Sequence, residues 1–254
     1  MTRPLRRLTA ALVAAIVLTL GLPSTGAAQI ERIDLKAHYP NLELVRAGHY
    51  LEGNNYISGE ARRSVLWFQE LSRNRFRQFN WGPEDARADC HFDQFRWQRQ
   101  TMRYQRTVDD CFGVRQVVKF KPAIRVMPRY WTPGETWTEN GTSEVTFTED
   151  GVVTCRGTMA WRADVLGYVE VAPGVEGIHV RSTQPTAWTE GSSDAGCAAG
   201  FVTPWEENYY LIPDMPIWGQ AGSTTGFKRS VGGNLAGGPD RWDVWFDAWT
   251  PLPS

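Results

Sequence analysis

The sequence lacks the spacings that mark common metal and redox sites. Its four cysteines, Cys90, Cys111, Cys155 and Cys197, form no C-x-x-C pair, and none of its four histidines is followed by another at i+2 or i+4. Zinc and thioredoxin-like sites depend on such short spacings because their ligands must converge on one point. We therefore expect the protein to bind no metal and no other cofactor.

Sequence signatures of catalysis are missing as well. No G-x-S-x-G sequence presents a nucleophilic serine, and the glycine-rich VGGNLAGGPD has no lysine and precedes a strand pattern rather than a helix. The adjacent pairs Asp109-Asp110 and Glu206-Glu207 would point to opposite faces of a strand, so neither forms an acid–base pair by itself. The sequence favours a binding protein, and a secreted hydrolase that uses a carboxylate pair is the enzymatic alternative.

A long apolar run occurs at the N-terminus alone. Leu8–Leu22 follows the basic residues Arg3, Arg6 and Arg7 and precedes the small-residue stretch PSTGAA. This order is typical of a secretory signal peptide, here residues 1–28, and the run is too short for a membrane span. Cleavage would leave 226 residues. We expect a secreted or extracytoplasmic protein, at most peripheral to the envelope, and both the Sec and the twin-arginine routes remain open.

Export places the four cysteines in an oxidising compartment, where disulfides form. Three pairings are open in principle. We favour Cys90–Cys111 and Cys155–Cys197 because each bond joins neighbours within one half of the chain.

Charge is distributed unevenly along the chain. Residues 62–129 carry 15 Lys or Arg against 7 Asp or Glu, whereas residues 130–254 carry 6 against 16. One interpretation is two solvated faces of a single domain. The other is a basic patch that meets an acidic envelope polymer or anionic lipid head groups. Nucleic acid is not an expected partner, because the chain is exported and contains no nucleic-acid-binding module.

Strand patterns dominate after an N-terminal segment, residues 29–60, that is expected to be loop with a short helix. Residues 61–79 are compatible with a helix or with two strands joined at SRN, and the run VLWF favours strands. FRWQ and MRYQ then alternate apolar and polar residues around RQT, which predicts a hairpin. Its buried side would hold Phe95, Trp97, Met102 and Tyr104.

Turn signals indicate how the strands continue. Asn140-Gly141 and Asp150-Gly151 are favoured two-residue hairpin loops, and YVEV and IHVRST flank APGVEG. There is no βαβ alternation. We therefore predict an all-β fold with minor α content, in which residues 61–254 form a single domain. Its antiparallel meander would make one large curved sheet, a half-barrel or open barrel.

Tryptophan is abundant, with twelve residues, and three lie in PDRWDVWFDAW near the C-terminus. If this stretch is a regular strand, Trp245, Trp249, Asp243 and Asp247 share one face and the other face is apolar. An indole beside a carboxylate suits a sugar ring, so this face is a candidate glycan- or cell-wall-binding surface. Alternatively, residues 29–60 or arginine side chains cover it, which is a purely structural arrangement.

Three stretches from Pro128 onward, PRYWTPGETW, VEVAPGVEGIHVRST and ENYYLIPDMPIWGQ, carry a resemblance. Their order resembles uncharacterised secreted bacterial β domains related to the LolA-like lipoprotein-carrier half-barrels, although IPDMP stands where the pattern has Pro-Gly. The resemblance implies a concave apolar face that holds a lipid or another apolar ligand, and no catalytic residues. A carrier of this kind needs an apolar lining, for which Phe95, Trp97 and Tyr104 are the candidates.

Overall fold

The computed structural model describes one compact unit that begins at Glu31. The predicted signal peptide, residues 1–28, lies outside the described residues. Within the described part, no helix combines the length and the hydropathy that a membrane span requires. The structure describes residues 31–39, 49–57, 60–79, 90–111, 113–192, 197–212, 215–224 and 240–251. For residues 49–57, 60–64, 215–224 and 240–251 it describes the strand pairing of the backbone but not the side chains.

The described chain consists almost entirely of strands, with one short 3-10 helix near its start. In chain order the elements are β1 Ile33–Asp34, η1 Leu35–Ala37, β2 His49–Ile57, β3 Glu60–Ser72, β4 Arg75–Phe79, β5 His91–Gln98, β6 Thr101–Asp109, β7 Gln116–Pro128, β8 Tyr130–Trp131, β9 Trp137–Glu149, β10 Val152–Ala172, β11 Val175–Thr183, β12 Thr186–Glu190, β13 Val202–Thr203, β14 Trp205–Ile212, β15 Met215–Thr224 and β16 Asp240–Pro251.

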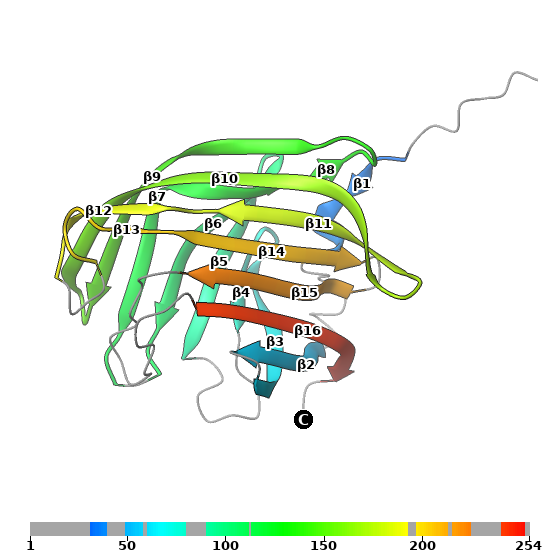
Figure 1. The fold of residues 1–254 in the computed structure, drawn as a ribbon, viewed down its shortest axis with the longest axis horizontal. Coiled ribbons are helices and arrows are strands. Elements are labelled where there is room, and N and C mark those ends of the chain that lie inside the picture. The colour runs from blue at the N-terminus through cyan, green and yellow to red at the C-terminus, as the bar shows by residue number, and fades with distance from the viewer. Residues whose placement is uncertain are drawn as a thin grey trace, which may run out of the picture. The chain divides into compact units, whose positions relative to one another are not determined.

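Fourteen strands form one large, curled antiparallel sheet, which confirms the predicted half-barrel class (Figure 1). The order is β11-β14-β15-β16-β2-β3-β4-β5-β6-β7-β9-β10-β12-β13, and β1 pairs with β8 separately. Strand β10 also pairs with β11, so the sheet curls until strands from both ends of this order meet. β9 pairs over its whole length with Val152–Val165 of β10, and β12 pairs with Arg156–Met159 of the same strand.

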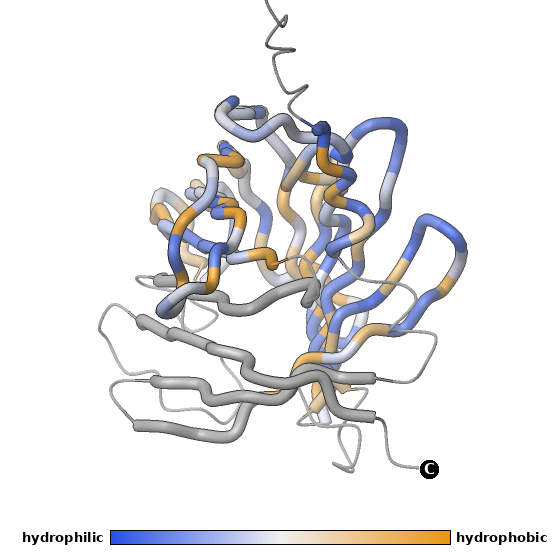
Figure 2. The backbone as a smooth tube through the Cα atoms, turned by 90° about the vertical axis from the view of Figure 1, so that its right-hand side faces the viewer, coloured by the Kyte–Doolittle hydropathy of each residue, from blue (hydrophilic) through white to orange (hydrophobic). Residues whose placement is uncertain are grey.

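Alternation of apolar and polar residues directs one face of the sheet inward. Blue and orange alternate along the described strands in Figure 2. The inward side chains form one large buried cluster, to which strands on both sides of the curl contribute, for example Leu66, Phe95, Ile124, Val165 and Leu211. Burial of this apolar surface is the main favourable contribution to folding.

Most of the predicted hairpins are confirmed. Residues 61–79 form strands β3 and β4 with a turn at Arg73-Asn74, and β5 and β6 form the expected hairpin. Asp150 and Gly151 join β9 to β10 with φ values of 47° and 85°. Two consecutive positive φ values are what a type I′ turn requires, and Asp-Gly tolerates them.

The hairpin loop predicted at Asn140-Gly141 is wrong. Both residues lie inside β9, where Gly141 pairs with Trp161 of β10. A Cβ on Gly141 would lie 2.6 Å from Cζ2 of Trp161, so the indole occupies the space that a side chain would fill. Glycine inside a strand often marks such a close approach. Here it serves packing rather than a turn.

A second correction concerns the stretch AGHYLEGNNYISGEA, which was expected to be loop. His49–Ile57 forms strand β2, which pairs with β16 on one side and β3 on the other. The short helix expected in residues 29–60 is the 3-10 helix Leu35–Ala37. Pairing on both sides satisfies the β2 backbone, and such tertiary context overrides the local loop signals of its Gly and Asn residues.

Both predicted disulfides are present. Cys90 bonds to Cys111, and Cys155 bonds to Cys197. The second bond ties the loop after β12 to the start of β10, and both of its cysteines are buried. Two disulfides are compatible with an extracytoplasmic location.

Candidate functional site

The start of the described chain is anchored near the end of β7 and delivers two side chains to the interior. The Asp34 carboxylate caps η1 by accepting a hydrogen bond from the Lys36 amide and pairs with Arg129 at 2.8 Å. The Leu35 amide donates to the Arg129 carbonyl at 2.7 Å. Leu35 and Tyr39 are consequently buried, with 0% and 1% of their surface exposed. We call Leu35–Tyr39 the plug segment.

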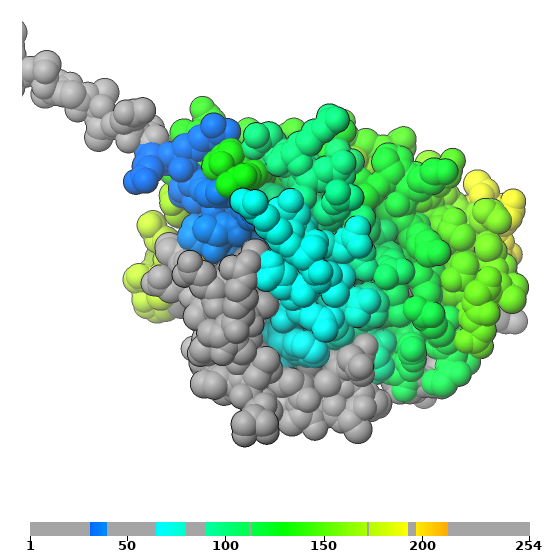
Figure 3. All heavy atoms as spheres, turned by 180° about the vertical axis from the view of Figure 1, so that it is seen from behind, coloured from blue at the N-terminus to red at the C-terminus, as the bar shows by residue number. Residues whose placement is uncertain are grey.

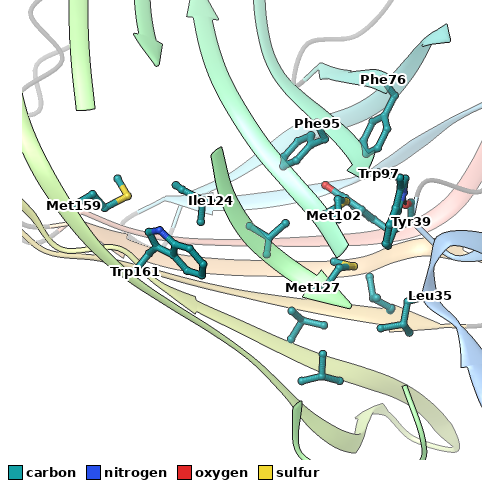
Figure 4. Packing of buried hydrophobic residues seen from close by; sticks show 14 of the residues in the cluster. Leu35, Tyr39, Phe76, Phe95, Trp97, Met102, Ile124, Met127, Met159 and Trp161 are labelled. Atoms are coloured by element: carbon teal, nitrogen blue, oxygen red, sulfur yellow. Dashed lines mark hydrogen bonds between the residues drawn. The ribbon is translucent and has the colours of Figure 1, made fainter. Parts of the chain in front are cut away.

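Tyr39 sits in an aromatic environment inside the curled sheet. Its ring makes edge-on contacts with Phe68, Phe76 and Phe95 at centroid distances of 5.7, 6.0 and 6.1 Å. The Trp97 indole nitrogen donates to the Tyr39 carbonyl at 3.2 Å. Figure 4 shows Tyr39 beside Trp97, with the stacked Phe76 and Phe95 nearby. Edge-on aromatic pairs contribute beyond their buried area.

The three residues predicted to line a ligand cavity are therefore close together. Phe95 stacks on Tyr104 at 4.9 Å, and Trp97 pairs across the hairpin with Met102. Tyr39 of the plug segment, however, contacts Phe95 and Trp97, which are each only 4% exposed, and it lines the same small cavity as Tyr104.

Polar groups gather inside this aromatic interior. The Tyr39 hydroxyl donates to the Gln78 side-chain oxygen. Tyr104 and Thr107 both donate to Oδ1 of Asp93, at 2.8 and 2.6 Å. On the opposite part of the sheet, Glu207, Tyr209, Ser182 and Gln184 form a second group, in which the Gln184 amide donates to the Ser182 hydroxyl at 2.8 Å. We call these nine residues the interior polar cluster.

The electrostatics of the cluster keep its tyrosines protonated. Burial raises the pKa of Tyr39, Tyr104 and Tyr209 well above the usual value of a phenol. The negative charges of Asp93 and Glu207 raise these pKa values further, because a nearby anion disfavours the phenolate. At neutral pH all three hydroxyls are hydrogen-bond donors.

A small cavity lies where the plug segment meets the cluster. Its volume is about 10 Å³, which is room for roughly one water molecule. A larger ligand would fit this cavity only if some of the residues that line it, such as Tyr39 of the plug segment, moved. The lining residues are Tyr39, Phe95, Met102, Tyr104, Val126, Met127, Gln184, Glu207 and Tyr209.

The surroundings of the two carboxyl groups in the interior polar cluster bear on the hydrolase alternative. A glycosidase needs a sugar-sized cleft between two carboxyl groups. Glu207 lines a cavity with room for about one water. Asp93 accepts hydrogen bonds from two side chains of its own hairpin. The arrangement offers aromatic walls and fixed hydrogen-bonding groups, which are the features of a ligand pocket.

The predicted aromatic face near the C-terminus lies elsewhere in the sheet. Trp245, Trp249, Asp243 and Asp247 belong to β16, which pairs with β15 and β2. Their side chains are outside the described part of the structure. The backbone pairing of β16 with β2 is irregular between Phe246 and Ala248, whereas the prediction of one shared face assumed regular pairing. The glycan-binding face stays a prediction.

Several residues of the site could have been found by extending the strand alternation. Asp93 is two residues before Phe95, and Glu207 is two residues before Tyr209, so each shares the inward face of its strand. Tyr39 had no such signal, because it follows a 3-10 turn and its partners are far away in sequence. Among the described residues, no three His, Cys, Asp or Glu side chains lie close enough to hold a metal ion.

Comparisons with protein-family models, with curated proteins and with solved structures find no match to this chain.

Proposed function

We propose that the protein is a non-enzymatic, extracytoplasmic binding protein that holds a lipid or another apolar ligand on the concave side of its curled sheet. The observation that carries the proposal is the burial of Tyr39. A side chain from the N-terminal segment occupies the aromatic interior as a ligand would, with ring contacts around it and a hydrogen bond from its hydroxyl to Gln78.

The plug segment is attached in a way that allows displacement. It consists of one 3-10 turn that follows the two-residue strand β1, whereas the sheet beneath it is paired over long strands. Short elements with few backbone hydrogen bonds open at lower free energy than a sheet core. Release of Tyr39 would expose Phe95, Trp97 and Tyr104 as the walls of a pocket. The hydroxyls of the interior polar cluster would orient the polar end of the ligand.

The direct test is mass spectrometry of the secreted protein in native and then in denaturing solution. A mass excess that denaturation releases as a lipid supports the proposal and identifies the ligand. Protein that carries no extra mass is then titrated with the apolar dye N-phenyl-1-naphthylamine, with oleate as the competitor.

Two variants sharpen the titration. Tyr39→Ala removes the occupant of the interior, and we expect it to bind the dye at least tenfold more tightly than the wild type. Phe201→Ala, which removes an aromatic side chain that is 40% exposed, is the matched control and should leave the affinity unchanged. Absence of dye binding by both the wild type and a folded Tyr39→Ala variant would refute the proposal.

A further inference from the structure

Arginines stand in register across four neighbouring strands. In β4 to β7, Arg75 pairs with Arg96, Arg96 pairs with Arg103, and Arg103 pairs with Arg125. Directly opposite residues of antiparallel strands project from the same face. The four guanidinium groups therefore form one row that runs across the strands.

This row lies on the outer face of the sheet. The neighbours of its members along the chain, Phe76, Phe95, Met102 and Ile124, belong to the interior cluster. Successive side chains alternate between faces, so the arginines project to the opposite side. The view of Figure 3 looks onto this side of the molecule, where the cyan-to-green surface of β4 to β7 is exposed.

A second basic row runs beside the first. Arg77 pairs with Gln94, Gln94 with Arg106, and Arg106 with Lys119. The Gln94 side-chain oxygen accepts hydrogen bonds from Arg106 Nε and Nη2 at 3.2 and 2.9 Å, which holds this guanidinium against the sheet. We call the two rows together the arginine face.

Little of the negative charge on the described residues balances the arginine face. Among the described residues, its one ion pair within 4.0 Å joins Arg125 to Glu139 at 3.0 Å. The Nε atoms of Arg77 and Arg103 are buried and have no hydrogen-bond partner. Burial, followed by the charge of Arg125, lowers the pKa of Arg103, and burial, followed by the charge of Arg77, lowers the pKa of Arg106.

Like charges directly opposite one another destabilise a sheet. Packing accounts for part of the second row, because the guanidinium carbons of Arg77 and Arg106 lie 4.2 and 5.9 Å from the centroid of the Phe92 ring. For the like charges that stand opposite one another in the first row, binding of an anion offers a reason. Guanidinium groups bind phosphate in a bidentate geometry. Adjacent strands are about 4.8 Å apart, so the first row spans roughly 15 Å and presents one guanidinium at each step.

The surface around the rows favours a polymer over a membrane. No residue of β4 to β7 is among the exposed large apolar side chains of the described chain. A membrane-binding face combines basic residues with apolar ones that enter the lipid. We propose that the arginine face binds a linear polyanion with repeated phosphate groups, which lies across strands β4 to β7.

The test uses the whole mature protein and linear inorganic polyphosphate as the probe, with binding measured by calorimetry over a series of salt concentrations. The variant Arg96→Gln/Arg103→Gln removes two charges from the middle of the first row. The control Arg32→Gln/Arg156→Gln removes two charges elsewhere, so both proteins have the same net charge. Thermal unfolding confirms that each variant is folded.

We expect the row variant to lose at least tenfold in affinity for polyphosphate and the control to lose less than threefold. The slope of log affinity against log salt should fall by about two for the row variant, since each released counterion contributes nearly one.

Other outcomes overturn the proposal. If the wild type does not bind polyphosphate, the proposal is wrong. Equal losses of affinity in the two variants would show that binding depends on net charge alone. If orthophosphate bound with the same affinity as polyphosphate, the site would hold a single anion and the row of arginines would have no role in binding a polymer. Tighter, row-dependent binding to phosphatidylglycerol vesicles than to polyphosphate would assign the face to a lipid surface instead.

Discussion

Tyr39→Ala removes the side chain around which the aromatic interior is packed. The tyrosine is 1% exposed and contacts the rings of Phe68, Phe76, Phe95 and Tyr209. Truncation of a fully buried aromatic side chain costs about 3–5 kcal/mol, because the transfer free energy of the removed atoms is lost and a cavity is left behind. We expect the free energy of unfolding to fall by about 4 kcal/mol.

Tyr39→Phe separates the hydroxyl from the ring. It keeps the aromatic contacts but leaves the oxygen of Gln78, which is 1% exposed, without its donor. An unsatisfied buried acceptor costs about 1–3 kcal/mol, so we expect a loss near the lower end of this range.

The assay is urea unfolding followed by circular dichroism, with Phe201→Ala as the control. The control should lose less than about 1 kcal/mol, because its side chain is partly solvated. The free energies of unfolding can be compared if the slope of this free energy against urea concentration is the same for all the proteins. If Tyr39→Ala lost no more than the control, the plug segment would not be packed as described, and the reasoning about the interior would be wrong.

Three further predictions concern other parts of the fold. Burial alone would raise the pKa of Asp164, but hydrogen bonds from two arginines and a threonine hold it below the usual carboxyl value. Its stabilising effect is therefore complete above about pH 4 and is lost as the pH falls through the lowered pKa. Asp164→Asn should cost about 2 kcal/mol at pH 7 and progressively less below pH 4 in urea titrations. Gly141→Ala should destabilise by more than about 1 kcal/mol, because the added methyl meets the Trp161 indole, and Trp161→Leu in the same background should recover part of the loss. Replacing both Cys155 and Cys197 by serine opens a loop with a sequence separation of 42 residues. On the chain-entropy model this costs about 4 kcal/mol, seen as a lower urea midpoint.

Local patterns were sufficient for the hairpins β5–β6 and β9–β10. Phe95, Trp97, Met102 and Tyr104 alternate with polar residues on two strands joined by a short turn, so their common face follows from the period of two. Asp150-Gly151 could be predicted because the required φ values depend on these two residues alone. In each case the information lies within a few residues of the sequence.

The features that the sequence predicted wrongly or missed depend on residues that are far apart in the sequence. Asn140-Gly141 has the same local turn signal as Asp150-Gly151, but an indole twenty positions further along the chain needs the space above Gly141. Tyr39 depends on rings from four different strands, and no local pattern brings them together. The arginine face required the pairing register of four strands, because the sequence shows the net charge of a region but not which side chains stand opposite one another.

The meeting of β10 and β11 affects how other chains can approach this protein. Strands at the rim of an open sheet display unpaired amide and carbonyl groups, which recruit strands from other molecules. In the described part of the chain, the order of strands ends in β13, which has two residues, and at its other end β11 is paired on both sides. At these two ends of the strand order, the backbone thus offers little template for edge-to-edge aggregation or for strand addition by a partner.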